Sequence, residues 1–428
     1  MSTARKPIAV GAFSTLLVFT LFAGDFWRNL LSWYGWGVIA LGLVVGSVVL
    51  LVRIRPPLLW RRLPVTLALF LLLATLSIAW SDYPGASALG VFLQWVTTIT
   101  ALFLALCLEW PQLLRALSHA FRWILGLSLA FEFIVAAFIR HPVLPFWTDY
   151  GTEKVPQAFY WSRGLLFHGG QIQGIQGNSN LLAMVALLAL VVFGIQFADG
   201  VVRRGSGIAW LVVAALTLVL TRSATVIITA VFTLVVLLFA LWMRRVRPDR
   251  RRPVYLTMLA SVVLGVAAVW VFSGQLLKLL GKSEDLTGRL DIWHSVTALA
   301  VQRPVFGWGW VSYWAPWVEP FKTLAVRKGV VYLQAHNAWL DVWLQLGVVG
   351  LVVFILLVAT TLTRSWFFAV DRPRVAVSDT LPYRALTLLP LLLIAALIAQ
   401  SAAESRMLVE AGWMLLVVVS VKTKRAAP

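Results

Sequence analysis

The stretch Val226-Ile-Ile-Thr-Ala-Val-Phe-Thr-Leu-Val-Val-Leu-Leu-Phe-Ala-Leu-Trp-Met243 contains no charged side chain. A helix needs about 20 mainly apolar residues to cross the roughly 30 Å hydrocarbon layer of a membrane. Arg222 precedes the stretch and a run of arginines from 244 to 252 follows it, so charged groups would lie at both membrane surfaces. The stretch therefore predicts a transmembrane helix.

The whole chain repeats this pattern. Of its 428 residues, 61% are hydrophobic and 12% are charged, which is too apolar for a water-soluble core. Eleven further apolar stretches lie at 8–23, 36–51, 65–80, 88–108, 124–138, 181–195, 208–220, 256–272, 346–362, 385–399 and 408–421. We predict an all-α integral membrane protein with about 12 transmembrane helices, forming a single membrane domain over residues 1–428.

The distribution of lysine and arginine predicts the orientation, because short loops that carry these residues stay in the cytoplasm. With twelve spans and both termini inside, most of the 36 basic residues fall in inner segments. The short outer connections at 24–32, 81–86, 221–223 and 403–406 carry only Arg28, Arg222 and Arg406. The net charge of +19 therefore lies mainly beside anionic lipid headgroups, and the expected partners are membrane lipids rather than nucleic acid.

Two predicted outer connections, 140–178 and 273–335, are too long to be simple turns, so function is expected there. The longer one contains a predicted helix at 287–302, followed by Arg303-Pro-Val-Phe-Gly-Trp-Gly-Trp. Tryptophans crowd this region at Trp308, Trp310, Trp314 and Trp317. They fit either an aromatic belt at the membrane surface or a platform that stacks on sugar rings and prenyl chains.

His336 lies where the longer loop re-enters the membrane, in Gln334-Ala-His-Asn-Ala-Trp-Leu. Polar side chains at this boundary cost free energy unless they have a binding partner or a function. Asn337 is suited to cap the next helix, which would place His336 at the positive helix end and keep its imidazole neutral. A neutral imidazole can accept a proton, although a histidine that only hydrogen-bonds its neighbours also fits this pattern.

Two arginines are candidate phosphate ligands, because a guanidinium binds phosphate oxygens in pairs. Arg222 stands in Leu220-Thr-Arg-Ser, and Arg289 in Gly288-Arg-Leu-Asp-Ile-Trp. The alternatives are snorkelling to the membrane surface for Arg222 and a solvated helix face for Arg289. Arg163 and His168, in Trp161-Ser-Arg-Gly-Leu-Leu-Phe-His, are weaker candidates, with a surface role favoured for His168.

The sequence contains no arrangement typical of a metal or nucleotide site. Asp-x-Asp, P-loop, His-Glu-x-x-His and Gly-x-Ser-x-Gly patterns are absent, and the nearest acidic group is Glu284-Asp285 with Asp291. The single cysteine, Cys107, excludes a thiolate cluster within one chain. No metal or other cofactor is expected.

Four motifs, in this order along the chain, resemble the O-antigen ligase (WaaL) family within the O-antigen ligase and polymerase superfamily. They are Gln176-Gly-Asn-Ser-Asn-Leu-Leu-Ala, Leu220-Thr-Arg-Ser, Gly288-Arg-Leu-Asp-Ile-Trp with Arg303-Pro-Val-Phe-Gly-Trp-Gly, and Ala335-His-Asn-Ala-Trp-Leu. The resemblance implies a GT-C-type glycosyltransferase of the bacterial inner membrane with a periplasmic active site. Such an enzyme moves polysaccharide from undecaprenyl diphosphate to a sugar hydroxyl of lipid A-core, completing lipopolysaccharide.

The resemblance also implies roles for individual residues. His336 would be the general base, while Arg222 and Arg289 would bind the donor diphosphate, in a metal-independent, inverting reaction. Further candidates for substrate binding are Arg163, His168, Asn337, Trp308 and Trp310. An O-antigen polymerase, a protein O-oligosaccharyltransferase and, from another class, a lipid or polysaccharide transporter remain alternatives.

Overall fold

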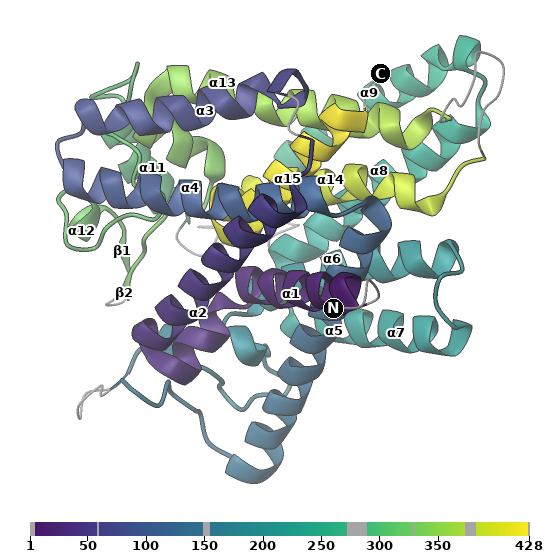
Figure 1. Cartoon of the computed structure of the whole chain (residues 1–428). Coiled ribbons are helices and arrows are strands. Elements are labelled where there is room, and N and C mark those ends of the chain that lie inside the picture. The colour runs from purple at the N-terminus through teal and green to yellow at the C-terminus, as the bar shows by residue number, and fades with distance from the viewer. Residues whose placement is uncertain are drawn as a thin grey trace.

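The computed structural model describes residues 5–57, 60–148, 155–271, 289–327, 330–372 and 382–426, and most of them are helical (Figure 1). The long helices are α1 (Arg5–Phe22), α2 (Gly24–Ile54), α3 (Val65–Leu76), α4 (Pro84–Cys107), α5 (Trp110–Ile134), α6 (Ser179–Ala198), α7 (Arg204–Thr221), α8 (Ala224–Arg245), α9 (Arg252–Val271), α13 (Ala338–Val370), α14 (Leu389–Ser401) and α15 (Glu410–Ala426). Each of the twelve predicted spans overlaps one of these helices, because long apolar sequences satisfy their backbone groups internally as helices.

The remaining elements are short. They are the helical turns η1 (Trp60–Arg62), η2 (Ser77–Ala79), η3 (Val135–Ile139), η4 (Gln157–Phe159), η5 (Gly174–Gln176), η6 (Pro248–Arg250), η7 (Ala385–Leu388) and η8 (Arg406–Leu408), the helices α11 (Arg289–Ala300) and α12 (Phe321–Leu324), and the antiparallel pair β1 (Val326–Arg327) and β2 (Val330–Val331). The predicted helix at 287–302 corresponds to α11, and residues 287–288 lie outside the described part. Glu284 and Asp285 lie outside it as well.

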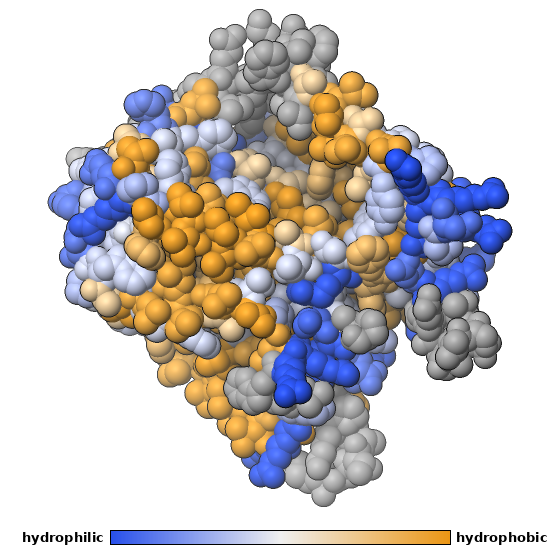
Figure 2. All heavy atoms as spheres, turned by 90° about the horizontal axis from the view of Figure 1, so that it is seen from above, coloured by the Kyte–Doolittle hydropathy of each residue, from blue (hydrophilic) through white to orange (hydrophobic). Residues whose placement is uncertain are grey.

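Among the described residues, seven helices are long and apolar enough to cross a membrane: α2, α4, α5 with its η3 extension, α6, α7, α8 and α13. Four shorter apolar helices lie at Ile8–Phe22, Val65–Ala79, Arg252–Gly265 and Ala385–Ser401. In Figure 2 apolar surface occupies the middle of the molecule, and hydrophilic residues gather toward its left and right edges. The chain is an all-α, multi-pass membrane protein, as predicted.

One predicted connection is itself helical. Residues 24–32 were expected to form an outer loop, but they are the first part of α2, which has a break at Ser32 (φ 67°). Arg28 pairs with Asp25 at 2.8 Å and lies over the ring of Trp33 at 4.8 Å. Asn29 is buried. These contacts hold polar residues in a helix that hydrophobicity alone does not predict.

The helices have two chemically different ends. At one, which we call the loop end, the α7–α8 turn, the α14–α15 turn and the start of α13 meet residues 289–335. At the other, the basic end, Arg244 donates to the carbonyl of Ala369 at 2.7 Å and Arg251 donates to that of Val370 at 2.9 Å. In Figure 1, α11, α12, β1 and β2 mark the loop end, at the left beside α3, α4 and α13.

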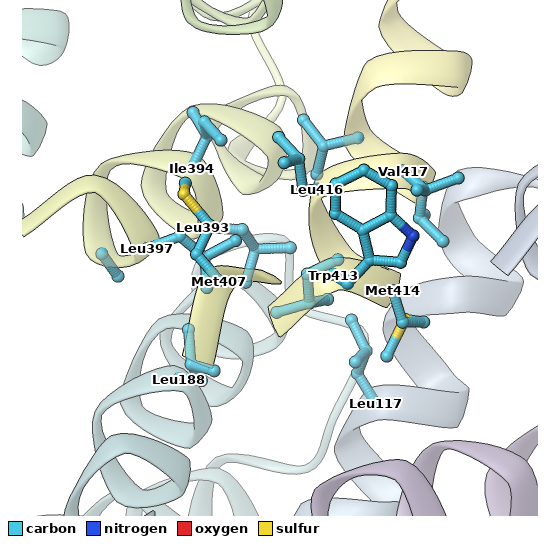
Figure 3. Close-up of a cluster of buried hydrophobic side chains, with 14 of the residues drawn as sticks. Leu117, Leu188, Leu393, Ile394, Leu397, Met407, Trp413, Met414, Leu416 and Val417 are labelled. Carbon is cyan, nitrogen blue, oxygen red and sulfur yellow. The ribbon is translucent and has the colours of Figure 1, made fainter. Parts of the chain in front are cut away.

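The centre of the bundle is formed by the last helix in the chain. Trp413 of α15 is fully buried and donates its indole N–H to Thr98 Oγ1 at 2.9 Å. Figure 3 shows Leu117 of α5, Leu188 of α6 and Leu393 of α14 gathered around this part of the chain. All of these side chains are buried, so α15 joins the helices from both halves of the chain into one core.

The segment after α11 is packed into the protein. Trp310 is fully buried against Phe70, with ring centroids 5.4 Å apart. Gly90 of α4 permits this approach, because a Cβ there would lie 2.4 Å from the backbone carbon of Val311. Gly309 has a φ of 106°, a conformation that favours glycine. Trp310 therefore belongs to the core, which corrects the expectation that it offers its face to a substrate.

Candidate functional site

The site is built at the loop end, and its first component is the start of α13. Asn337 caps this helix as predicted, accepting from the backbone N–H groups of Trp339 (3.0 Å) and Leu340 (3.2 Å). His336, one residue earlier, has a φ of 50°. An L residue occupies this left-handed region only when its surroundings hold it there.

The buried carboxylate of Asp341 stabilises this backbone conformation. Asp341 accepts from the backbone N–H of Ala335 at 3.0 Å, from the indole N–H of Trp314 at 2.8 Å, and from the hydroxyl of Ser405. The carbonyl of Ala335 in turn accepts from Trp293 of α11 at 3.0 Å. The backbone before His336 is therefore tied to α11, to the α14–α15 turn and to the tryptophan-rich segment at once.

The imidazole of His336 contacts Glu404, a residue that the sequence did not single out. Glu404 lies in the turn between α14 and η8, and its Oε2 is 2.9 Å from His336 Nδ1. Its other oxygen, Oε1, accepts from Arg289 Nη2 at 2.9 Å. The Glu404 side chain is only 8% exposed, so one buried carboxylate joins two of the predicted site residues.

The charge state of Glu404 determines what His336 can do. Burial raises the pKa of Glu404, but the positive charge that His336 carries when protonated, the hydrogen bond from His336 and the charge of Arg289 outweigh this effect and leave the pKa below its ordinary value. An ionised carboxylate only accepts hydrogen bonds, so Nδ1–H of His336 must donate to it. The other ring nitrogen, Nε2, is then the one that can take a proton.

The first two motifs of the sequence reach the same carboxylate. Asn180, at the start of α6, donates from Nδ2 to Glu404 Oε1 at 3.3 Å. Its Oδ1 accepts from the hydroxyl of Ser223 at 2.7 Å. Ser223 caps α8 and directly follows Arg222, so all four motifs meet within one hydrogen-bond network.

Arg222 stands at the edge of this network. It ends α7 with a φ of 49°, and its side chain is exposed. Gln171 Nε2 donates to its carbonyl at 3.4 Å, and a Cβ on Gly169 would lie 3.6 Å from its Nη2. Within the described ranges its guanidinium has no ion pair. Arg289 differs, since it is bound to Glu404 and lies 3.5 Å from Thr225 Oγ1.

In the described part of the chain, Arg163, His168 and Trp308 form no hydrogen bond or ion pair with His336. Arg163 donates to Gln173 Oε1 at 3.2 Å within the loop that precedes α6, and His168 is exposed in the same loop, next to Gly169. Trp308 donates to the carbonyl of Leu299 at 3.0 Å and is covered by Arg303. The backbone N–H of Trp308 donates to the carbonyl of Leu344 at 3.0 Å, so Trp308 also joins the long loop to α13.

Glu404 could have been suspected from its position. It stands in Ala402-Ala-Glu-Ser-Arg, a short connection between two apolar stretches. A charged side chain there costs free energy unless it has a partner or a function. No group of three or more His, Cys, Asp or Glu side chains in the described ranges could hold a metal ion. The site is thus a histidine held by a buried carboxylate that it shares with Arg289, with the exposed Arg222 at the edge of the same hydrogen-bond network.

Comparison with known proteins bears on the same region. Residues 209–355 match the family profile described as O-antigen ligase. The matched segment includes Arg222, Arg289 and His336, whereas Asn180 and Glu404 lie outside it. No curated protein matches the chain.

Proposed function

The match over residues 209–355 confirms the resemblance to the O-antigen ligase superfamily, and on that premise we propose that the protein is an O-antigen ligase. It would transfer polysaccharide from undecaprenyl diphosphate to a sugar hydroxyl of lipid A-core. The observation that carries the proposal is the contact of Glu404 with both His336 and Arg289. It joins a proton acceptor to a phosphate-binding group in one buried arrangement.

His336 activates the acceptor in this proposal. Its Nε2 removes the proton from the acceptor hydroxyl while the hydroxyl oxygen attacks the anomeric carbon of the donor sugar. Glu404 holds the imidazole in the required tautomer and stabilises the imidazolium that forms, as carboxylates do beside catalytic histidines. The backbone contacts of Ala335 and Asn337 fix the position of the ring.

The arginines act on the leaving group. As the bond from the anomeric carbon to the diphosphate oxygen breaks, negative charge grows on the diphosphate. The exposed Arg222 can pair with it directly, and Arg289 has further N–H donors beyond the one used by Glu404. Direct displacement inverts the anomeric centre, and no metal is required for the charge balance.

The charge pattern supports a location for the protein in the same proposal. The basic end of the bundle would face the cytoplasm and the loop end the periplasm of a bacterial inner membrane, with both termini cytoplasmic. Donor and acceptor are both amphiphiles of the outer leaflet in this reaction. Each would reach His336 from the membrane, beneath the long loop.

Reconstitution tests the proposal. The purified protein is placed in liposomes with undecaprenyl diphosphate-linked polysaccharide and rough lipopolysaccharide, and the product is examined by gel electrophoresis. A ladder of higher mass on lipid A-core, absent with the His336→Ala variant, supports ligation. Elongation of the lipid-linked donor without transfer to the core would show a polymerase instead.

A further inference from the structure

A large groove lies away from the site, along α1, α2 and α5. It encloses about 1180 Å³. Its apolar length is lined by side chains including Leu16, Phe19, Phe26, Trp27 and Leu127. In Figure 1, α1 lies beside α5 near the middle of the molecule, and α2 runs next to α1. From Gln112 to Leu127 the groove follows α5 for roughly 22 Å, which is more than half of the hydrocarbon thickness.

The end of the groove near the basic end is polar. Gln112, Arg115 and His119 line it, and their spacing of three and four residues places them on one face of α5. Arg115 and His119 are both exposed, and neither has a side-chain hydrogen bond or ion pair with another described residue. The nearby carboxylate of Glu109 caps the start of α5.

These two basic side chains lie deep along the helix. Arg115 and His119 are roughly 8 and 14 Å from Trp110 along the axis of α5. The cationic guanidinium of Arg115 is costly at this depth unless it pairs with another group or reaches the headgroup layer, and the imidazole of His119 is available beside it as a hydrogen-bond donor. An apolar groove of this length that ends in unpaired basic groups matches the chemistry of a phospholipid with a net negative charge.

We propose that this groove binds one anionic phospholipid, such as phosphatidylglycerol, with its acyl chains along α1 and α5 and its phosphate beside Arg115 and His119. The bound lipid fills space between the first two helices and the rest of the bundle. It enters from the leaflet at the basic end, opposite to the loop end. The proposal does not depend on the transfer reaction.

Native mass spectrometry of the full-length protein, released from micelles that contain equal amounts of phosphatidylglycerol and phosphatidylethanolamine, tests this assignment. The wild-type protein should retain phosphatidylglycerol preferentially. The Arg115→Gln/His119→Gln variant should bind it roughly fivefold or more weakly, since the charge of an arginine near the phosphate contributes about 1 kcal/mol and the variant also loses the hydrogen-bonding imidazole of His119. Arg203→Gln/Arg204→Gln removes exposed charge at the same end outside the groove and should leave the preference unchanged.

A second pair of variants tests the groove itself. Gly11 lines it, and a Cβ at this position would meet nothing within 4 Å, so Gly11→Leu should fold and occupy the space of an acyl chain. Gly42 is equally open but lies outside the groove, and Gly42→Leu is the matched control. Phosphatidylglycerol binding should fall only in Gly11→Leu.

Equal retention of both phospholipids by the wild type, unaffected by Arg115→Gln/His119→Gln and Gly11→Leu, would overturn the proposal in favour of ordinary annular lipid. Displacement of phosphatidylglycerol by undecaprenyl phosphate at equal concentration would also overturn it, and would assign the groove to a prenyl chain.

Discussion

Replacing Glu404 by glutamine tests the site most directly, because the change keeps the shape of the side chain and removes its charge. The carboxylate receives hydrogen bonds from His336 Nδ1 and Arg289 Nη2, both at 2.9 Å. An amide can instead donate to Nδ1, which moves the imidazole proton to Nε2. The imidazole would then present a donor to the acceptor hydroxyl and could no longer take its proton.

The expected loss in transfer rate is large. Where a carboxylate that orients a catalytic histidine becomes an amide, the wrong tautomer lowers the rate by about 10⁴. We expect a fall of about 10³ to 10⁴ for Glu404→Gln, equivalent to roughly 4 to 5.5 kcal/mol in the activation barrier. Arg289 also loses its buried counter-charge, and breaking such a pair costs about 3–5 kcal/mol of stability.

The assay is transfer in liposomes, measured together with the melting temperature of each purified variant. Asp199→Asn is the matched control, since this carboxylate accepts from the backbone N–H groups of Ala385 (2.7 Å) and Leu386 (3.1 Å) far from the site. It should lose stability but keep its rate per folded molecule. Transfer by folded Glu404→Gln within a few-fold of wild type would refute the assigned role of Glu404.

Four further outcomes are expected. His336→Ala should insert normally and lower transfer by about 10² to 10⁴, so near-normal transfer would remove His336 from the mechanism. Arg222→Lys and Arg289→Lys keep the charge but lose the two-pronged geometry, and each should transfer poorly; normal rates in both would leave only an electrostatic role. Transfer should persist in excess EDTA, and inhibition that Mg²⁺ or Mn²⁺ reverses would contradict this. Because the pKa of Glu404 is lowered from its ordinary value of 4.5 in the folded protein, its contribution to stability is present above about pH 4.5 and is lost as the pH falls through the lowered value. Melting temperatures should therefore fall more steeply in acid for wild type than for Glu404→Gln, and parallel curves would argue against the shift.

The sequence predicted the helices well because membrane insertion depends on local composition. Each apolar stretch had to satisfy its own backbone groups, and the cap at Asn337 depends on residues within one turn. The helical start of α2 was missed for the opposite reason. Its polar residues, Asp25 and Arg28, pair with each other within the helix, so they do not mark a loop.

The site itself could be predicted only in part. His336, Arg222 and Arg289 stand in recognisable motifs, but Glu404 is a single acidic residue in a short turn, and its contact with His336 joins positions 68 residues apart. The burial of Trp310 also could not be predicted from the sequence. Tryptophan-rich sequence looks the same at a membrane surface and in a core, and the difference here depends on Gly90, in a distant helix.

The central position of α15 has a consequence for biosynthesis. Ribosomes make this helix after α4, α5, α6 and α14, yet Trp413 and Leu416 are fully enclosed among these earlier helices. The earlier helices must therefore remain incompletely packed in the membrane until the hairpin of α14 and α15 enters among them. That hairpin also brings Glu404, so a nascent or truncated chain has neither its core nor its base-orienting carboxylate. In the proposed reaction, activity would begin only after this hairpin has been inserted.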